Sequence, residues 1–322
     1  MKKNVFSRLI APVALGLCLS MGGMVAAQTV SVSSIVEHPA LDSVRDGIND
    51  VLKEEGYTDN DDFKWQFQTA QGNTAIAAQI ARKFVGDDSD VIVAISTPSA
   101  QAVVAATKEI PVVYSAVTDP VAAQLVPQME ASETNVTGVS DALALEDQVD
   151  LIQRLVPDVK SIGMVYNPGE ANSVVVVEAL RELLSERDIK LVEATAARTV
   201  DVGAAARSLV GKVDAIYTNT DNNVVSAYEA LVKVGNDAQI PLIASDTDSV
   251  ERGAIAALGI NYYDLGRQTG TMVHRILQGE VPGEMPSEYG QKLELFINLD
   301  AAKKQGVTID QEVIDEAVKV IE

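Results

Sequence analysis

Residues 91–99 read Val-Ile-Val-Ala-Ile-Ser-Thr-Pro-Ser, an apolar run that stops at a small polar loop. The apolar residues predict a buried strand, and a helix is expected from Pro98 to about Thr107. In an open α/β sheet, ligands bind in the crevice at the carboxyl ends of the strands. Helix N-termini in that crevice offer unpaired N–H groups to a small anion. The stretch therefore predicts both an α/β fold and part of a binding site.

The same junction of strand, polar loop and helix occurs four more times. The other loops are Glu37-His38-Pro39-Ala40, Asn167-Pro168-Gly169-Glu170-Ala171-Asn172-Ser173, Thr220-Asp221-Asn222-Asn223 and Ser245-Asp246-Thr247-Asp248. Two sets of such loops indicate that two halves of the chain hold something small between them.

Strands and helices alternate along the whole chain. The expected strands are 30–36, 63–69, 91–95, 111–117, 161–166, 189–195, 215–219, 241–244, 254–259 and 293–298; the expected helices include 40–55, a short one opening at 118–120, 262–278 and 310–321. This alternation implies parallel sheets with right-handed crossovers. Two series of similar size predict two doubly wound parallel-sheet α/β domains. Because no flexible linker separates them, we expect hinge strands, one of them near Ser140.

The composition excludes several classes of function. The formal net charge of −21 argues against nucleic-acid binding, because a phosphate backbone requires a basic face. Catalysis is disfavoured, because His38 and His274 are the only histidines and no Gly-x-Ser-x-Gly motif occurs. We expect no metal site and no cofactor, since the histidines are far apart and no phosphate-binding glycine loop follows the first strand.

The first residues have the pattern of an export signal. Lys2, Lys3 and Arg8 precede an apolar segment, residues 9–19, and Val25-Ala26-Ala27 matches the small-residue rule for cleavage. Cleavage after Ala27 would leave Gln28 as the first residue and remove Cys18, the only cysteine. We therefore expect a periplasmic protein.

Five motifs together resemble one known family. They are His38-Pro39-Ala40-Leu41-Asp42, Ser96-Thr97-Pro98, Val117-Thr118-Asp119-Pro120, Thr137-Gly138-Val139-Ser140-Asp141 and Tyr166-Asn167-Pro168-Gly169-Glu170-Ala171-Asn172-Ser173. In this order and spacing they resemble the ABC-transporter substrate-binding proteins typified by tryptophan/tyrosine-binding proteins. The resemblance implies the type I periplasmic binding protein fold. It implies an N-terminal domain of residues 28–140 plus about 260–287, and a C-terminal domain of 141–259 plus about 288–322.

An amino acid needs hydrogen-bond donors for its carboxylate and acceptors for its ammonium group. The quoted loops contain no Arg or Lys, so we expect the carboxylate near Thr97-Pro98-Ser99 or Ala171-Asn172-Ser173. The candidate acceptors are Asp119, Asp141, Glu170, Asp221 and Asp246, with Asn222 beside them. Asp221 and Asp246 are the preferred ammonium partners, although helix capping, hinge locking or a solvated turn would equally explain these carboxylates.

The apolar part of such a ligand needs an apolar surface that excludes water. His38, Pro39, Ala40 and Leu41 are one candidate wall, and Tyr166 could add a ring face. We expect the Tyr262-Tyr263 pair to seat the tail helix rather than to contact ligand.

The sequence thus predicts a monomeric periplasmic protein that captures Trp, Phe or Tyr and delivers it to an ABC permease in the inner membrane. Two alternatives remain open. The same fold could bind an aliphatic amino acid, an amide, a peptide or a sugar, or it could serve a membrane sensor. An enzyme is a remote third alternative.

Overall fold

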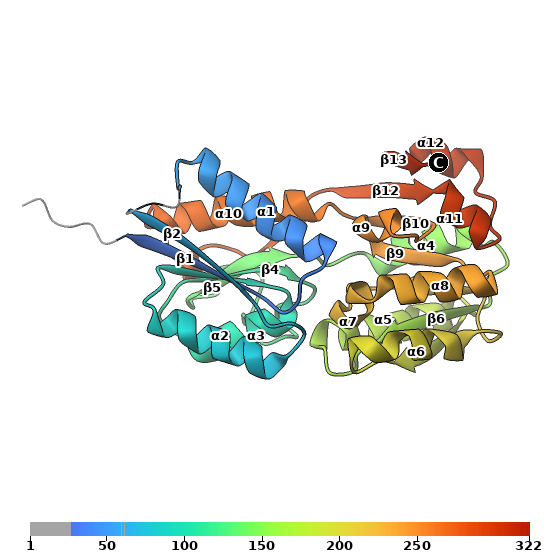
Figure 1. Cartoon of the computed structure of the whole chain (residues 1–322), viewed down its shortest axis with the longest axis horizontal. Helices are drawn as coiled ribbons and strands as arrows, with labels where there is room; N and C mark the ends of the chain where they lie inside the picture. The colour runs from blue at the N-terminus through green and yellow to red at the C-terminus, as the bar shows by residue number, and fades with distance from the viewer. Residues whose placement is uncertain (1–26, 59, 61) are drawn as a thin grey trace, which may run out of the picture.

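The computed structural model describes residues 27–58, 60 and 62–322, so the expected export signal lies outside the described residues except for Ala27. Two parallel β-sheets, each covered by helices, lie side by side along the longest axis of the molecule (Figure 1). We call each sheet with its covering helices a lobe. The predicted architecture of two doubly wound α/β units is confirmed.

The first lobe has a six-stranded sheet of order β11-β5-β4-β3-β1-β2. Helices α1 and α10 cover one face of this sheet, and α2 and α3 cover the other (Figure 1). The strands are β1 Gln28–Ser34, β2 Phe63–Thr69, β3 Val91–Ile95, β4 Val112–Val117, β5 Val136–Ser140 and β11 Glu288–Tyr289; the helices are α1 Pro39–Glu54, α2 Thr74–Gly86, α3 Thr97–Ala106 and α10 Tyr262–Leu277.

The second lobe has a seven-stranded sheet of order β13-β12-β10-β9-β8-β6-β7, parallel except where β10 meets β12. Its strands are β6 Ser161–Tyr166, β7 Lys190–Thr195, β8 Ala215–Thr218, β9 Leu242–Asp246, β10 Ala256–Ile260, β12 Leu293–Asn298 and β13 Lys319–Ile321. Its helices are α4 Leu145–Leu155, α5 Ala171–Glu186, α6 Val202–Leu209, α7 Asn222–Ser226, α8 Tyr228–Ala238, α9 Asp248–Glu251, α11 Leu299–Lys304 and α12 Gln311–Glu316. Two single 3₁₀ turns, η1 Thr199–Asp201 and η2 Pro282–Glu284, complete the regular elements.

The chain passes between the lobes three times. It leaves the first sheet after β5, returns after β10 to form α10, and leaves again after β11. The pairing of Glu288 and Tyr289 with β5 carries the first lobe two residues past the expected boundary near residue 287. Three short connections at one side of the molecule can act as hinges while the two cores stay intact.

Helices α1 and α10 pack with their backbones in close approach. A Cβ atom at Gly47 would lie 2.3 Å from the Tyr263 carbonyl oxygen, and one at Gly266 would lie 2.2 Å from the Val44 carbonyl oxygen. Glycine is therefore required at both positions by packing. The contact fixes the start of α10 beside the start of α1, at the end of the lobe that faces the second lobe (Figure 1).

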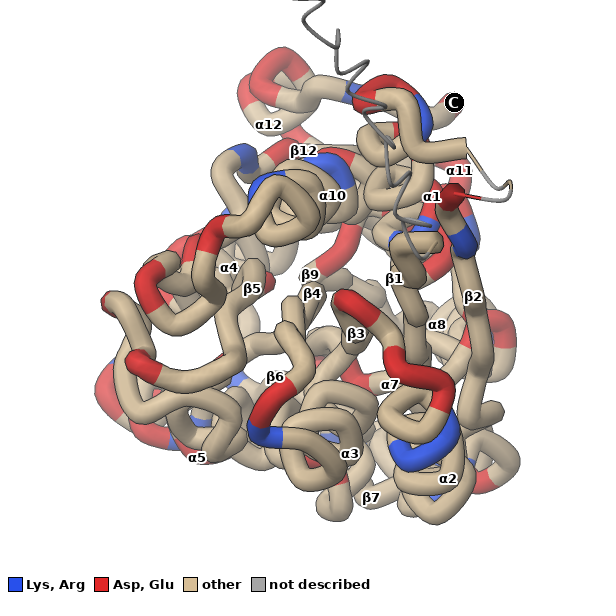
Figure 2. Tube along the Cα trace, turned by 90° about the vertical axis from the view of Figure 1, so that its left-hand side faces the viewer, with Lys and Arg blue, Asp and Glu red and all other residues tan. Residues whose placement is uncertain are grey.

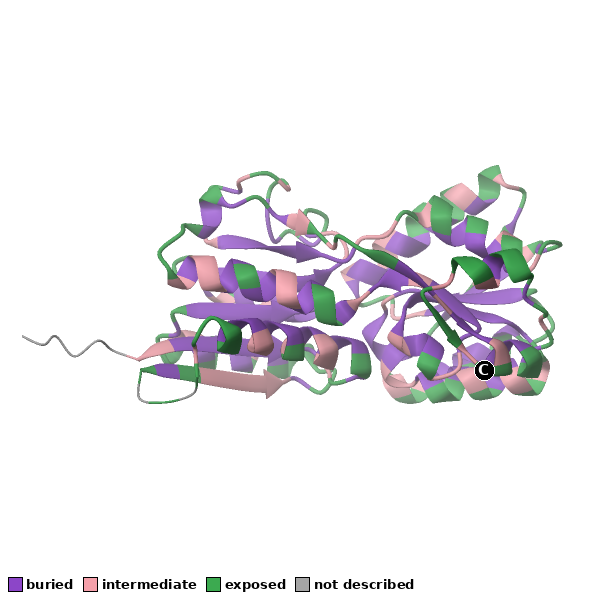
Figure 3. Cartoon of the chain, turned by 90° about the horizontal axis from the view of Figure 1, so that it is seen from above, coloured by how far each residue is buried: buried purple, intermediate pink, exposed green. Residues whose placement is uncertain are grey.

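Buried apolar strands hold each lobe together. All five residues of β3 are buried, as are all six of β4, because helices cover both faces of a parallel sheet (Figure 3). The side chains that are exposed lie mainly on the outer faces of the helices and in loops (Figure 3).

Two predicted elements are wrong. Residues 118–120 lead into turns instead of a helix. Asp119 Oδ1 accepts the amides of Val121 and Ala122 as a helix cap would. After one helical bond, from the Ala123 amide to the Asp119 carbonyl, the amides of Leu125 and Val126 both donate to the Pro120 carbonyl, so no regular helix follows. The expected helix 310–321 ends at Glu316, and β13 then pairs in parallel with β12. Alternating Val318 and Val320 favour that strand.

No helix among residues 27–58, 60 and 62–322 is long and apolar enough to cross a bilayer. Acidic residues are spread along helices and loops, with basic residues between them (Figure 2).

Candidate functional site

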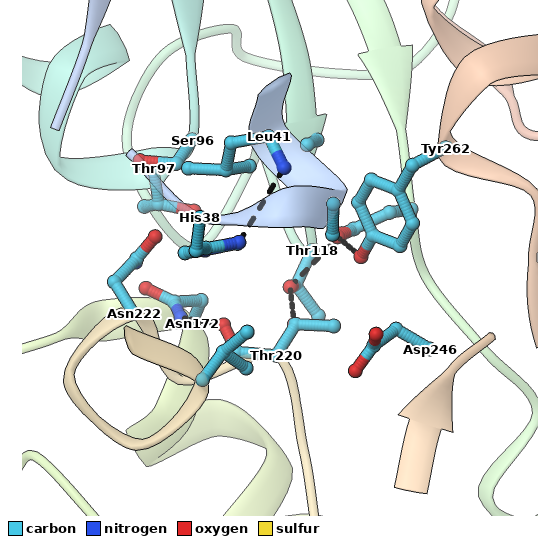
Figure 4. A pocket seen from close by; sticks show the side chains of 14 residues that line it. His38, Leu41, Ser96, Thr97, Thr118, Asn172, Thr220, Asn222, Asp246 and Tyr262 are labelled. Atoms are coloured by element: carbon cyan, nitrogen blue, oxygen red, sulfur yellow. Dashed lines mark hydrogen bonds between the residues drawn. The ribbon is translucent and has the colours of Figure 1, made fainter. Parts of the chain in front are cut away.

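A narrow cleft lies between the lobes, at the carboxyl ends of the strands of both sheets. We call it the central cleft; it holds about 340 Å³ of space not filled by protein atoms. Its lining residues come from helix starts and strand ends of both lobes: His38, Ala40, Leu41, Ser96, Thr97, Ala116, Thr118, Asp141, Asn172, Thr220, Asn222, Val225, Asp246 and Tyr262 (Figure 4). None of them is Lys or Arg. The expected position of the site between two halves of the chain matches this cleft.

The start of α3 gives the first-lobe wall its donors. The first turn of a helix leaves its N–H groups without intrahelical acceptors, and here the amides of Thr97 and Ser99 have this position. The hydroxyls of Ser96, Thr97 and Ser99 are buried, and none has a hydrogen-bond partner among the described residues. Buried hydroxyls without partners are costly, so this wall is suited to an anionic ligand group that would accept from them.

The backbone beside these hydroxyls is strained. Ser96 has φ +76° and ψ 157°, a region that residues other than glycine rarely adopt. Ala116, at the end of the neighbouring strand β4, also has a positive φ of +55°. Both residues line the central cleft, and such strain gathers at functional sites because the surrounding fold enforces it.

His38 contributes a further donor. Its Nδ1 accepts the Leu41 amide at 3.4 Å as the N-cap of α1. Burial, with a smaller contribution from the Arg252 charge, lowers the pKa of His38 to about 3. The imidazole is therefore neutral, and because Nδ1 is an acceptor the proton lies on Nε2. His38, Asn172 and Asn222 lie close together in the cleft (Figure 4).

Two carboxylates line the same cleft, one in the connection that follows β5 and one at the end of β9 in the second lobe. Asp141 follows β5 and accepts from Thr118 Oγ1 at 3.0 Å and from the Tyr262 hydroxyl at 2.7 Å. Asp246 ends β9 and accepts from the Ser249 amide and hydroxyl at 2.8 and 2.7 Å. Burial raises the pKa of both groups, and the charge of Asp246 raises the pKa of Asp141 further. A cation between them would relieve this repulsion.

The second-lobe wall rests on a buried hydrogen-bond network around Glu170. Glu170 Oε2 accepts from the Asn222 amide at 3.1 Å, from Asn222 Nδ2 at 2.6 Å and from Asn172 Nδ2 at 3.3 Å. Burial and the nearby charge of Asp221 raise the pKa of Glu170 to about 7. Because both amide NH₂ groups point to Glu170, Asn172 and Asn222 keep their carbonyl oxygens for other partners, and Asn172 Oδ1 has none.

Asp221 lies outside the central cleft, which corrects its assignment as an ammonium partner. It is fully buried, and its Oδ1 caps α7 by accepting the amides of Asn223 and Val224 at 3.0 Å. Its Oδ2 accepts the Asn167 amide and the Ser173 hydroxyl, both at 2.6 Å. Asp221 and Ser173 thus support the wall instead of facing ligand.

The other expected site residues divide between the cleft and its surroundings. His38, Ala40, Leu41, Thr97, Asp141, Asn172, Asn222 and Asp246 line the cleft, whereas Pro39 is exposed, Pro98 and Ser99 lie behind it, and Asp119 lines a neighbouring cavity. Tyr166 lines neither cavity; its hydroxyl donates to Glu193 at 3.0 Å. The side chain of a strand's last residue can face either side of the sheet, and here it faces outward.

Six lining residues were not expected from the sequence: Ser96, Ala116, Thr118, Thr220, Val225 and Tyr262. Ser96, Thr118 and Thr220 stand inside or next to the quoted loops, so their loop positions were an available signal. Tyr262 was assigned to seating the tail helix, and this is corrected: its buried side chain lines the cleft and binds Asp141. Tyr263, whose hydroxyl donates to Asp50 of α1, joins the two helices.

Comparisons with known proteins place this chain in a family. The model of the ABC transporter substrate binding protein family matches residues 29–321. The chain is 41% identical over 276 residues to the tyrosine-binding protein of Clostridioides difficile, covering 86% of this chain and 80% of that protein.

Two solved structures of similar proteins superpose on this chain to different degrees. An ABC domain in complex with L-Trp from Streptococcus pneumonia is 34% identical and gives a TM-score of 0.88 over 92% of this chain and 100% of that one. The ligand-free, open structure of CD0873 from Clostridium difficile is 39% identical but gives 0.69 over 92% and 99%. The chain therefore superposes better on the L-Trp complex than on the open structure, although it is slightly more similar in sequence to the open one.

Proposed function

The chain belongs to the ABC transporter substrate-binding protein family, and from this premise we propose that it binds an aromatic L-amino acid, Trp, Tyr or Phe, in the central cleft. One observation carries the proposal: the cleft offers unpartnered donors at one wall and two buried carboxylates beside them, with no Lys or Arg. This is the complement of a zwitterion. The names of the tyrosine-binding relative and of the L-Trp complex support an aromatic side chain.

The proposed roles follow the polarity of the cleft. The ligand carboxylate accepts from the start of α3, the hydroxyls of Ser96 and Thr97 and Nε2 of His38. The ammonium group lies between Asp141 and Asp246, within reach of the amide oxygens of Asn172 and Asn222. Since the donors for the carboxylate belong to the first lobe and Asp246 belongs to the second, the ligand favours the closed arrangement over the open one by its differential affinity.

We propose that the chain works outside the cytoplasm as a monomer, without cofactor or catalysis and without binding nucleic acid. The leader pattern of residues 1–27 supports export to the periplasm, and the family supports docking of the closed form on an ABC permease.

We also propose functional domains of 28–140 with about 260–289, and 141–259 with about 290–322. The three connections between the lobes support these bounds.

Thermal unfolding of the chain from Gln28 onward, against the twenty L-amino acids and a sugar panel, tests the proposal. A ligand at 100 times its Kd should stabilise the protein by about 2.7 kcal/mol. We expect this stabilisation with aromatic L-amino acids, and none with their N-acetyl derivatives or methyl esters, which lack one charged end. Stabilisation by sugars alone, or by no aromatic amino acid, would refute the proposal.

A further inference from the structure

A second, larger cavity opens directly beside the central cleft. It holds about 580 Å³ of space not filled by protein atoms, against about 340 Å³ in the cleft. We call it the side cavity. Thr118, Asp141 and Thr220 line both spaces, so the two meet at these residues. Thr118 and Thr220 come from different lobes and their Oγ1 atoms are 3.5 Å apart (Figure 4).

The chemistry of the side cavity differs from that of the cleft. Its wall is mostly apolar and includes Leu143 and Leu145 before and at the start of α4, Val175, Val176 and Ala179 on α5, and Tyr217 on β8. Ligand pockets of this kind are mainly apolar, with a few polar atoms that set orientation. The size and the apolar wall of the cavity are suited to an aromatic ring, for which the narrow, polar cleft leaves little room.

Two buried polar atoms of the side cavity's lining lack a partner among the described residues, Ser245 Oγ and Asn219 Oδ1, and the second is an acceptor only. Asn219 is 2% exposed, and its Nδ2 donates to Ser173 Oγ at 3.2 Å, which fixes the orientation of the amide. Its Oδ1 is buried without a hydrogen-bond partner among the described residues. A buried acceptor without a donor is costly, and the phenol O–H of Tyr or the indole N–H of Trp would satisfy it. The ring of Phe has no such donor.

We propose that the side cavity holds the aromatic ring of the ligand, with Asn219 Oδ1 accepting from the ring's donor group, while the amino-acid head group lies in the central cleft. This rests on the proposed function and goes further, since it places the specificity for the side chain on α4, α5 and β8 of the second lobe. It moves the apolar wall away from residues 38–41, where the sequence had suggested it. Asp141, which lines both spaces, then lies where the head group and the ring join.

The test compares isothermal titration of L-Trp, L-Tyr and L-Phe into four proteins. Ala179 is exposed at the mouth of the side cavity, so Ala179→Phe should fill the cavity without disturbing the core. We expect it to weaken binding of L-Trp at least 30-fold. Ala75→Phe, at an exposed position of α2 outside both cavities, should bind as the wild type does. Asn219→Ala should weaken L-Tyr and L-Trp about 10-fold and leave L-Phe unchanged.

The outcomes separate this inference from the proposed function. If the wild type binds aromatic amino acids and Ala179→Phe binds them equally well, the ring lies elsewhere and only the present inference falls. An equal loss for all three ligands in Asn219→Ala would refute the role of Oδ1. If the wild type binds none of the three, the proposed function itself falls. Should Ala179→Phe fail to fold, Val175→Phe narrows the same cavity and carries the same expectation.

Discussion

The two walls of the central cleft are made from the same strand–loop–helix junctions, yet they leave their polar atoms in opposite states. At the start of α3, the hydroxyls of Ser96 and Thr97 are buried without partners. At the starts of α5 and α7, the carboxylates of Glu170 and Asp221 each accept several hydrogen bonds. Among the described residues, the first wall is left with donors that have no acceptor, whereas in the second wall the carboxylates are already organised and the Asn172 Oδ1 acceptor stays without a donor.

This difference indicates how a zwitterion can be oriented without an arginine. Unpartnered donors gain most from a carboxylate, because the ligand satisfies them for the first time. Fixed acceptors gain from an ammonium group, because they need no rearrangement to receive it. The loops differ in composition, because hydroxyls stand at the start of α3 and carboxylates in the second-lobe loops. The orientation of the ligand therefore comes both from which side chains are present and from which of their atoms are already used.

The largest expected effect comes from removing a carboxylate that the ammonium group would contact. Asp246→Asn removes a carboxylate that lines the cleft, and we expect L-Trp affinity to fall about 100-fold, or about 2.8 kcal/mol. Calorimetry with L-Trp and with its analogue lacking the amino group measures the effect. Asp248→Asn, two residues further on and outside the cleft, is the matched control. An equal loss for the analogue would contradict the pairing of Asp246 with the ammonium group.

The next effect concerns protonation in the second wall. Because the pKa of Glu170 is raised to about 7 in the folded protein, the folded state binds a proton between about pH 4.5 and 7 that the unfolded state does not. Glu170 should therefore add about 2 kcal/mol to the free energy of unfolding of the ligand-free protein as the pH falls from 7 to 5. His38 acts in the opposite direction over the same range, because its pKa is lowered to about 3 and only the unfolded state takes up its proton. The contribution of Glu170 is therefore the difference between the wild type and a variant without this carboxylate.

Urea unfolding at pH 5, 6, 7 and 8 measures this contribution. Relative to the wild type, Glu170→Gln should lack this contribution at pH 5, whereas Glu193→Gln, at an exposed position of the same lobe, should keep the wild-type pH dependence. Burial raises the pKa of Asp141 and Asp246 in the same direction, so part of the slope should remain in Glu170→Gln. A wild-type slope in that variant would show that Glu170 does not titrate in this range.

The smallest expected effects, on stability and affinity, test the difference between the two walls directly. Thr97→Val removes a hydroxyl without a partner, so the ligand-free protein should become more stable by about 1 kcal/mol while ligand binding weakens about 10-fold. Ser173→Ala removes a hydroxyl that donates to the buried Asp221, so stability should fall by about 1–2 kcal/mol. Chemical unfolding of both variants without ligand provides the measurement. Stability changes of the same sign would contradict the difference between the walls.

The fold could be predicted from the sequence because its signals are local. The apolar runs at 91–95, 161–166 and 293–298 coincide with β3, β6 and β12 residue for residue. The errors came at residues 118–120, where the hydrogen bonds after Asp119 close turns instead of a helix, and at 310–321, where β13 pairs with β12. A strand pairing between segments some 20 residues apart leaves little trace in a short window of sequence.

The candidate site could be predicted only in part. Loop positions identified Thr97, Asp141, Asn172 and Asp246, because the carboxyl ends of parallel strands share one edge of a sheet. They could not show that the oxygens of Asp221 are already taken by four donors, nor that Tyr262 turns into the cleft. A buried side chain can bind a ligand only through atoms that are not already hydrogen-bonded. Here those bonds join segments some 50 to 120 residues apart, so the sequence of one loop does not show them.

The close packing of α1 against α10 also sets the order in which the chain can finish folding. The first strands and α1 are synthesised early, but their backbone neighbour begins at Tyr262, and the edge strand β11 ends at Tyr289. The first lobe therefore stays open along one face until nearly the whole second lobe has left the ribosome. A nascent chain of this topology is slow to become compact, because its decisive contacts span most of its length. Late compaction keeps the chain unfolded for longer, and the proposed export across a membrane would act on the unfolded chain.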